Sequence, residues 1–240
     1  IGADLLVVGY HLLTFGLIDF AHAYAWAIWT FWFLGGYAVY RFGANIFGRW
    51  GGLLAGFLFM TDTAANRIGG WYFAMEWGVW PMSLSIVLAV WAMSRVPRLM
   101  KGDRWRDVAI FGVLMAASLV SHPFMLIHFA LALVVAVLAF WLSDNEAHWI
   151  VGTGRLVLGW LTGTLIAMIW VLPFISSSDF MDPHFGGRWT NLLEMGNGLY
   201  NLDLFPGTWA VVIALGAIGM VALLWSRRFE HLLCGLLCIT

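Results

Sequence analysis

The chain has 240 residues, of which 62% are apolar and only 10% are charged, and its mean hydropathy is +0.86. An ordinary soluble domain has about 25% charged residues, so this composition excludes a typical water-soluble enzyme and a disordered tail. The net charge of −1 gives no broad positive field, which excludes a nucleic-acid-binding domain. We expect an all-α polytopic transmembrane bundle, because helices satisfy their own backbone hydrogen bonds in lipid and the alternating pattern of barrel strands is absent.

Apolar runs along the chain predict about seven to nine membrane spans, some of them short, because a span takes about 20 mostly apolar residues. In chain order the runs are Leu5–Ile18, Ala23–Tyr40, Ile46–Met60, Trp77–Met93, Val108–Val120, Phe124–Leu142, Leu156–Ile175, Trp209–Trp225 and one that begins at Leu232. The first run is either a short span or a helix that lies at the membrane interface. We expect residues 1–240 to be a single transmembrane domain, incomplete at both ends, of a longer chain.

The basic residues set the orientation. Ten of the twelve lie in alternate connectors, namely Arg41, Arg49, Arg95, Arg98, Lys101, Arg104, Arg106, Arg155, Arg227 and Arg228. The positive-inside rule places these connectors in the cytoplasm, and this rule alone explains their short basic sequences. The other connectors, which hold only Arg67 and Arg188, are expected to face outward from a bacterial cytoplasmic (inner) membrane. The longest of them, residues 176–208, is predicted to be an extracytoplasmic loop, and a loop of this length is often functional.

Asp19 and His22 are the first outward-facing candidates. They are three residues apart, so they share one face at the start of a helix. One interpretation is a general-base pair or a pair of metal ligands. The other is that Asp19 only caps the helix that follows.

The segment 67–81 carries the densest signal. Glu76 is an ionisable group beside an apolar span, which is costly unless the group is paired or hydrated, and Arg67 is its candidate partner. Trp71 and Tyr72 follow two glycines and would bind a substrate by stacking. The alternative is that these aromatic residues belong to the interfacial belt and that Glu76 lies in headgroup water.

The remaining candidates are His122, Arg188 and a loose acidic group. His122 precedes Pro123, which ends a helix there, and the histidine either contacts substrate as a base or caps a turn. An outward-facing Arg188 suits a phosphate. A weak metal-like spacing occurs at Asp179, Asp182 and His184, so the sequence predicts no definite metal site, and it leaves open whether a divalent cation takes part. Neither a disulfide nor a zinc site is expected at Cys234 and Cys238.

Five segments carry a resemblance to a known family. They are the span end Gly35–Gly43, the glycine-rich Trp50–Met60, Gly69-Gly70-Trp71-Tyr72, Glu76–Pro81 and Leu119-Val-Ser-His-Pro123. Together they resemble the polytopic glycosyltransferases of the C superfamily. The chain looks closest to the bacterial branch called the 6-pyruvoyl-tetrahydropterin-synthase-related membrane domain, over roughly residues 20–225.

The resemblance implies a polyprenyl-phosphate-linked sugar donor and transfer, with inversion, to an acceptor glycan, lipid or protein on the extracytoplasmic face. It implies a catalytic acidic residue in the first outer loop, for which Asp19 is the late candidate in this chain. It also assigns Glu76, His122 and Arg188 to the neighbourhood of the donor phosphate or the acceptor. Two alternatives stay open: a non-catalytic membrane subunit or scaffold that packs against membrane-protein partners, and a lipid or polysaccharide transporter.

Overall fold

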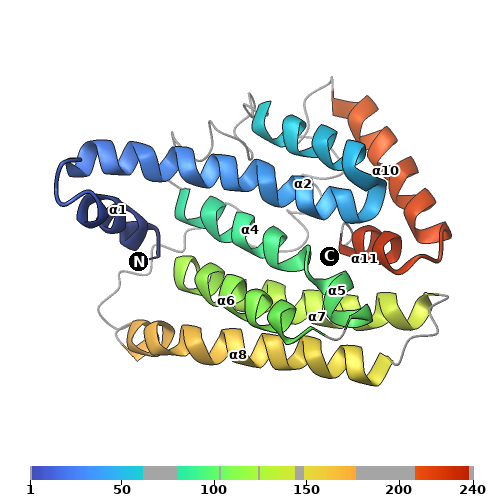
Figure 1. Cartoon of the computed structure of the whole chain (residues 1–240). Coiled ribbons are helices and arrows are strands. Elements are labelled where there is room, and N and C mark those ends of the chain that lie inside the picture. The colour runs from blue at the N-terminus through green and yellow to red at the C-terminus, as the bar shows by residue number, and fades with distance from the viewer. Residues whose placement is uncertain are drawn as a thin grey trace, which may run out of the picture.

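The computed structural model describes residues 2–61, 80–102, 104–123, 125–143, 149–176 and 209–237. Within this part of the chain every regular element is an α-helix (Figure 1). In chain order the helices are α1 Gly2–Leu13, α2 Phe20–Thr61, α4 Trp80–Met93, α5 Val96–Lys101, α6 Trp105–Ser121, α7 Met125–Leu142, α8 Trp149–Ser176, α10 Trp209–Trp225 and α11 Phe229–Leu237. The all-α prediction is therefore confirmed for the described residues.

Helix α2 folds back on itself. The chain breaks at Gly48, whose φ of 73° and ψ of 178° lie in a region that essentially only glycine adopts. The two arms then pack closely, because a Cβ at Gly52 would lie 2.6 Å from the carbonyl oxygen of Tyr40, and one at Gly56 would lie 2.7 Å from that of Gly36. The two predicted spans Ala23–Tyr40 and Ile46–Met60 thus correspond to the arms of one helical hairpin, but their predicted bounds are wrong. The turn lies at Gly48, inside the predicted second span, and residues 41–45, expected to connect the spans, are helical.

Two other predicted boundaries shift. The run that starts with the predicted span Trp77–Met93 continues beyond Met93, because α5 follows α4 after a single turn and carries Arg98 and Lys101 within a helix. Helix α1 has 12 residues and is about 18 Å long. This described length is shorter than the roughly 30 Å of a hydrocarbon core.

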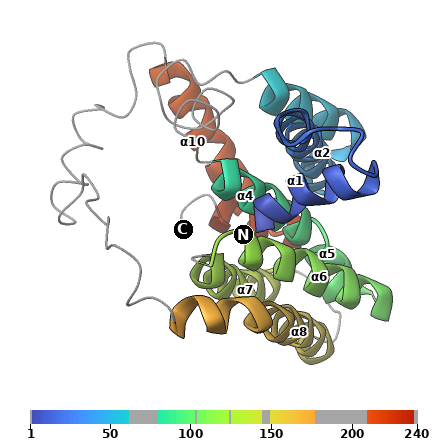
Figure 2. The ribbon, with the colours of Figure 1, turned by 90° about the vertical axis from the view of Figure 1, so that its left-hand side faces the viewer.

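The helices alternate in direction and form a layered bundle. Figures 1 and 2 show α2 on one side, α8 on the other, and α4, α6 and α7 between them. The turn at Gly48, the α4–α5–α6 connection and the turn between α10 and α11 meet at one end, which we call the basic end. All ten basic residues of the alternate connectors lie at this end or within about two helical turns of it. The start of α2 and the ends of α6 and α8 lie at the opposite end, the Asp19 end.

Close backbone contacts hold the layers together. Helix α6 meets α8 at Gly112 and Gly163, where a Cβ on Gly163 would lie 2.7 Å from the carbonyl oxygen of Gly112. Helix α4 meets α6 through Ser85 and Ser118, whose hydroxyls each donate to the other residue's carbonyl oxygen at 2.8 Å. Both serines are fully buried, so the two hydrogen bonds satisfy polar groups that lipid would leave unpaired.

Three described helical stretches are long and apolar enough to cross a membrane: Pro81–Lys101, Met125–Leu142 and Ile150–Pro173. Large apolar side chains also cover the outer faces of these helices, with Val134 exposed by 62%, Leu165 by 69% and Ile169 by 71%. In water such a surface would aggregate, whereas lipid tails cover it at no cost. Length, composition and the apolar exterior together indicate a membrane protein.

Candidate functional site

The Asp19 end holds a carboxylate–imidazole pair at the start of α2. The Asp19 Oδ1 atom accepts a hydrogen bond from the backbone N–H of His22 at 2.8 Å and lies 2.8 Å from Nδ1 of the same residue. Ala23 N–H donates to the Asp19 carbonyl oxygen at 2.8 Å. Asp19 thus caps α2, as one of the two interpretations predicted, and it also contacts the imidazole of His22.

The pair is exposed, and its carboxylate is ionised. The side chains are 66% exposed for Asp19 and 74% for His22. The backbone N–H of His22, followed by its side chain, lowers the pKa of Asp19 below the ordinary aspartate value, so the carboxylate is ionised at neutral pH. An ionised carboxylate next to Nδ1 favours the tautomer that carries the proton there, which leaves the lone pair on Nε2. In this arrangement the His22 Nε2 atom can accept a proton from a hydroxyl.

An aromatic groove of about 380 Å³ runs from His22 along α2, lined by His22, Ala25, Trp26, Trp29 and Phe33. The last four of these residues follow His22 by three, four, seven and eleven positions, so all five side chains lie on one face of the helix. The rings of Trp29 and Phe33 lie 6.2 Å apart, and Trp26, Trp29 and Phe33 are each about half exposed. A polar pair at the head of an apolar groove of about 16 Å suits an amphiphile that lies along the bundle.

His122 lies at the same end, between α6 and α7. Helix α6 ends at Ser121, and His122 has an extended backbone with φ −153° and ψ 104°, as the following proline predicts. Burial, followed by the positive charge that His128 can carry, lowers the pKa of His122 below the ordinary histidine value. His122 is therefore neutral at pH 7 and suited to donating or accepting a hydrogen bond rather than to pairing with an anion.

The other predicted site residues lie outside the described residues. This applies to the catalytic candidate Glu76, to the substrate-binding candidates Arg67, Trp71, Tyr72 and Arg188, and to Asp179, Asp182 and His184. Within the described part of the chain no three His, Cys, Asp or Glu side chains gather as a metal site would require. Of the predicted residues, the structure brings together Asp19 and His22.

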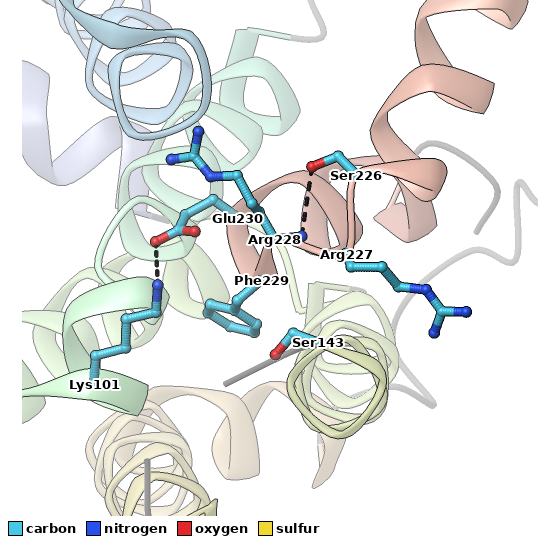
Figure 3. A pocket seen from close by; sticks show the side chains of 7 residues that line it. All are labelled: Lys101, Ser143, Ser226, Arg227, Arg228, Phe229 and Glu230. Atoms are coloured by element: carbon cyan, nitrogen blue, oxygen red, sulfur yellow. Dashed lines mark hydrogen bonds and ion pairs between the residues drawn. The ribbon is translucent and has the colours of Figure 1, made fainter. Parts of the chain in front are cut away.

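Sequence reasoning missed a group of cavities at the basic end. One, of about 250 Å³, lies where the end of α5 meets the turn between α10 and α11 (Figure 3). A second, of about 560 Å³, shares Lys101 and Glu230 with it and adds Arg98, Arg104 and Asn45. The positive-inside rule explained each of these cations separately, and only the fold shows that they line common cavities. The adjacent arginines at positions 227 and 228, followed two residues later by Glu230, were the available signal.

Comparison of the chain with protein-family models, with curated proteins and with solved structures gives no match. The chemistry of the Asp19–His22 pair and of the groove beside it is therefore inferred from their own residues and geometry.

Proposed function

We propose that this protein is a membrane-embedded glycosyltransferase that takes a sugar from a polyprenyl-phosphate-linked donor at the Asp19 end. The observation that carries the proposal is the aromatic groove on α2, which begins at His22, the partner of Asp19. The resemblance to the C-superfamily glycosyltransferases supports the same reaction class. A polyprenyl chain fits an apolar groove, and the donor's polar head then lies beside a base.

The chemistry assigns a role to each group. The acceptor hydroxyl loses its proton to His22, which Asp19 orients, while the acceptor oxygen forms a bond to the sugar C1 atom. The bond between C1 and the phosphate oxygen breaks on the opposite side, and polyprenyl phosphate leaves as an anion. A cationic or hydrogen-bonding group near that phosphate lowers the barrier, and Arg67, Arg188 and His122 are the candidates. Glu76 is the candidate for a second carboxylate at the acceptor.

The proposal includes a topology. We infer a multi-pass protein of the bacterial cytoplasmic membrane, with the basic end in the cytoplasm and the Asp19 end outside. Labelling of a Thr14→Cys variant by a membrane-impermeant maleimide in intact cells tests it, with Arg104→Cys as the matched control and Cys234 and Cys238 replaced in both. Labelling at position 14 and protection at position 104 are expected. The reverse pattern would overturn the topology.

The decisive test separates the two roles of Asp19. Asparagine caps a helix about as well as aspartate, so Asp19→Asn preserves α2 but removes the charge that orients His22. We expect the variant of the full-length protein to fold normally and to lose about 10²–10⁴-fold in sugar transfer from a polyprenyl-phosphate donor. Asp4→Asn, the same change on the exposed side of α1, is the control and should keep full activity. Normal transfer by Asp19→Asn would leave this residue as a cap only and refute the proposed base.

A second variant tests the groove. Trp26→Ala should raise KM for the long-chain donor and change kcat little, because it removes contact with the lipid tail rather than with the reacting atoms. Trp141→Ala, a 74% exposed tryptophan on α7 outside the groove, is the control and should leave KM unchanged. Flux of the donor without product would instead indicate a transporter, and failure to bind any donor would indicate a scaffold. Either result would overturn the enzymatic proposal.

A further inference from the structure

The smaller cavity at the basic end is lined by six polar or charged residues and one phenylalanine. It lies among α5, the end of α7 and the turn that joins α10 to α11 (Figure 3). Its lining residues are Lys101, Ser143, Ser226, Arg227, Arg228, Phe229 and Glu230. Of these seven described residues three are cationic and one is acidic, so together they carry an excess of positive charge.

The single carboxylate does not neutralise this excess. Glu230 Oε1 accepts a hydrogen bond from Lys101 Nζ at 2.7 Å, so this pair is internally balanced. Burial raises the pKa of Glu230, but the hydrogen bond from Lys101, its own backbone N–H and the charges of Lys101 and Arg228 outweigh that effect and lower the pKa overall. Among the described residues, Arg227 donates a long hydrogen bond of 3.5 Å to the carbonyl oxygen of Leu142 and forms no ion pair. Within this part of the chain its guanidinium is therefore free to pair with a bound anion.

The turn holds its two arginines on different sides. Arg227 has a φ of 54°, which is uncommon for a residue other than glycine, asparagine or aspartate. Figure 3 shows Arg228 extending towards Glu230 while Arg227 extends away from it. The following helix α11 adds the positive end of its dipole directly after these residues. A strained turn that spreads two cations in this way suggests a functional constraint.

An apolar groove adjoins the polar cavity and shares Arg227 with it. This groove has a volume of about 730 Å³ and lies between α10 and the end of α7, lined by Leu142, Val221, Leu224, Trp225, Arg227 and Leu232. Val221 is 59% exposed and Trp225 is 84% exposed. A cationic cavity that continues into an apolar groove matches a molecule with an anionic head and a hydrocarbon tail.

We propose that the basic end binds an anionic phospholipid, with its phosphate at Arg227, the residue shared by the two cavities, and an acyl chain in the groove of Val221 and Trp225. The apolar groove selects a lipid over a soluble phosphate ester, because a small phosphate would leave that groove unfilled. The excess positive charge selects a headgroup without its own cation, such as a phosphoglycerol. This site lies at the end opposite the Asp19–His22 pair, so it is independent of the proposed glycosyl transfer.

Native mass spectrometry of the full-length protein in mild detergent tests the proposal. The protein is incubated with equal amounts of phosphatidylglycerol and phosphatidylcholine, and retention of each lipid is measured as the collision energy rises. We expect preferential retention of phosphatidylglycerol. Each cation near a lipid surface contributes enough for about fivefold tighter binding, so Arg227→Asn should weaken retention of phosphatidylglycerol about fivefold. Asparagine is chosen because it tolerates a left-handed backbone.

Two further variants make the result specific. Arg106→Asn removes an exposed arginine of the same end that lines none of the three cavities, and it should leave retention unchanged. Val221→Trp fills the apolar groove and should reduce retention of phosphatidylglycerol without changing any charge. If Arg227→Asn fails to fold, as judged by gel filtration and circular dichroism, Arg228→Asn replaces it.

Three outcomes would overturn the proposal. Equal losses in Arg106→Asn and Arg227→Asn would mean that general surface charge, not this cavity, holds the lipid. Displacement of the bound lipid by millimolar inorganic phosphate, together with no effect of Val221→Trp, would assign the cavity to a soluble phosphate. Equal retention of the two lipids would exclude headgroup selection. None of these measurements depends on sugar transfer at the Asp19 end. The lipid-binding proposal and the glycosyltransferase proposal can therefore each be refuted without the other.

Discussion

The contact between α6 and α8 leads to the sharpest prediction on stability. Gly163 of α8 faces the backbone of α6, where an added Cβ would lie 2.7 Å from the carbonyl oxygen of Gly112 and 3.0 Å from Cβ of Met115. Gly154, on the same helix, has no atom within 4 Å of the same added carbon. The substitutions Gly163→Ala and Gly154→Ala are therefore chemically identical and differ only in the space around them.

The size of the effect follows from these distances. Ordinary contacts begin near 3.4 Å, so alanine at position 163 forces the two helices apart by several tenths of an ångström against a backbone atom that cannot rotate away. Overpacking of this kind costs about 1–3 kcal/mol. Both variants gain up to about 1 kcal/mol from the better helix propensity of alanine, which cancels in the comparison. Gly163→Ala should be less stable than Gly154→Ala by about 2 kcal/mol, or about 4–8 °C in Tm.

Thermal unfolding in one detergent, followed by gel filtration or by the fluorescence of a thiol-reactive dye, measures the difference. Gly154→Ala should match or exceed the wild-type Tm, and Gly163→Ala should fall below it. Equal Tm values for the two variants would refute the close approach of α6 and α8 and, with it, the layer order of the bundle.

Three further predictions follow from the described contacts. Gly48→Ala should destabilise the α2 hairpin by about 1–3 kcal/mol because alanine is strained at this φ and ψ, and an unchanged Tm would contradict the sharp turn. Ser85→Ala and Ser118→Ala should each cost about 0.6–1.7 kcal/mol, and the double variant less than their sum because both hydroxyls belong to one hydrogen-bonded unit; strict additivity would argue against that unit. The pKa of Glu230 is lowered in the folded protein, so the ionised carboxylate adds to the free energy of unfolding. This contribution should be complete above the ordinary glutamate pKa of about 4.3 and should disappear as the pH falls through the lower pKa of the folded state. Acid unfolding curves should therefore be flatter in Glu230→Gln than in the wild type, and identical slopes would contradict the ion pair with Lys101.

Local sequence was sufficient for much of the helical organisation. The apolar runs predicted an all-helical chain, because a bilayer core requires long apolar stretches whatever their neighbours are, but they misplaced the turn within α2. His122-Pro123 fixed the end of α6, since proline acts on the residue directly before it. The alternation of basic connectors indicated which helix ends share a side, and the fold gathers these residues at one end. Asp19 and His22 were found for the same reason, because a cap and its third residue are neighbours in the sequence.

Tertiary structure alone decided how these elements meet. The hairpin of α2 depends on the approach of Gly52 to Tyr40, and a glycine in an apolar run does not reveal which backbone will approach it. The charged cavity at the basic end joins Lys101 to Glu230 across 129 positions of the chain, a separation for which no local pattern exists. Spacing along a helix determines which residues share a face, but only packing brings faces together, because helix contacts depend on shape rather than on sequence distance.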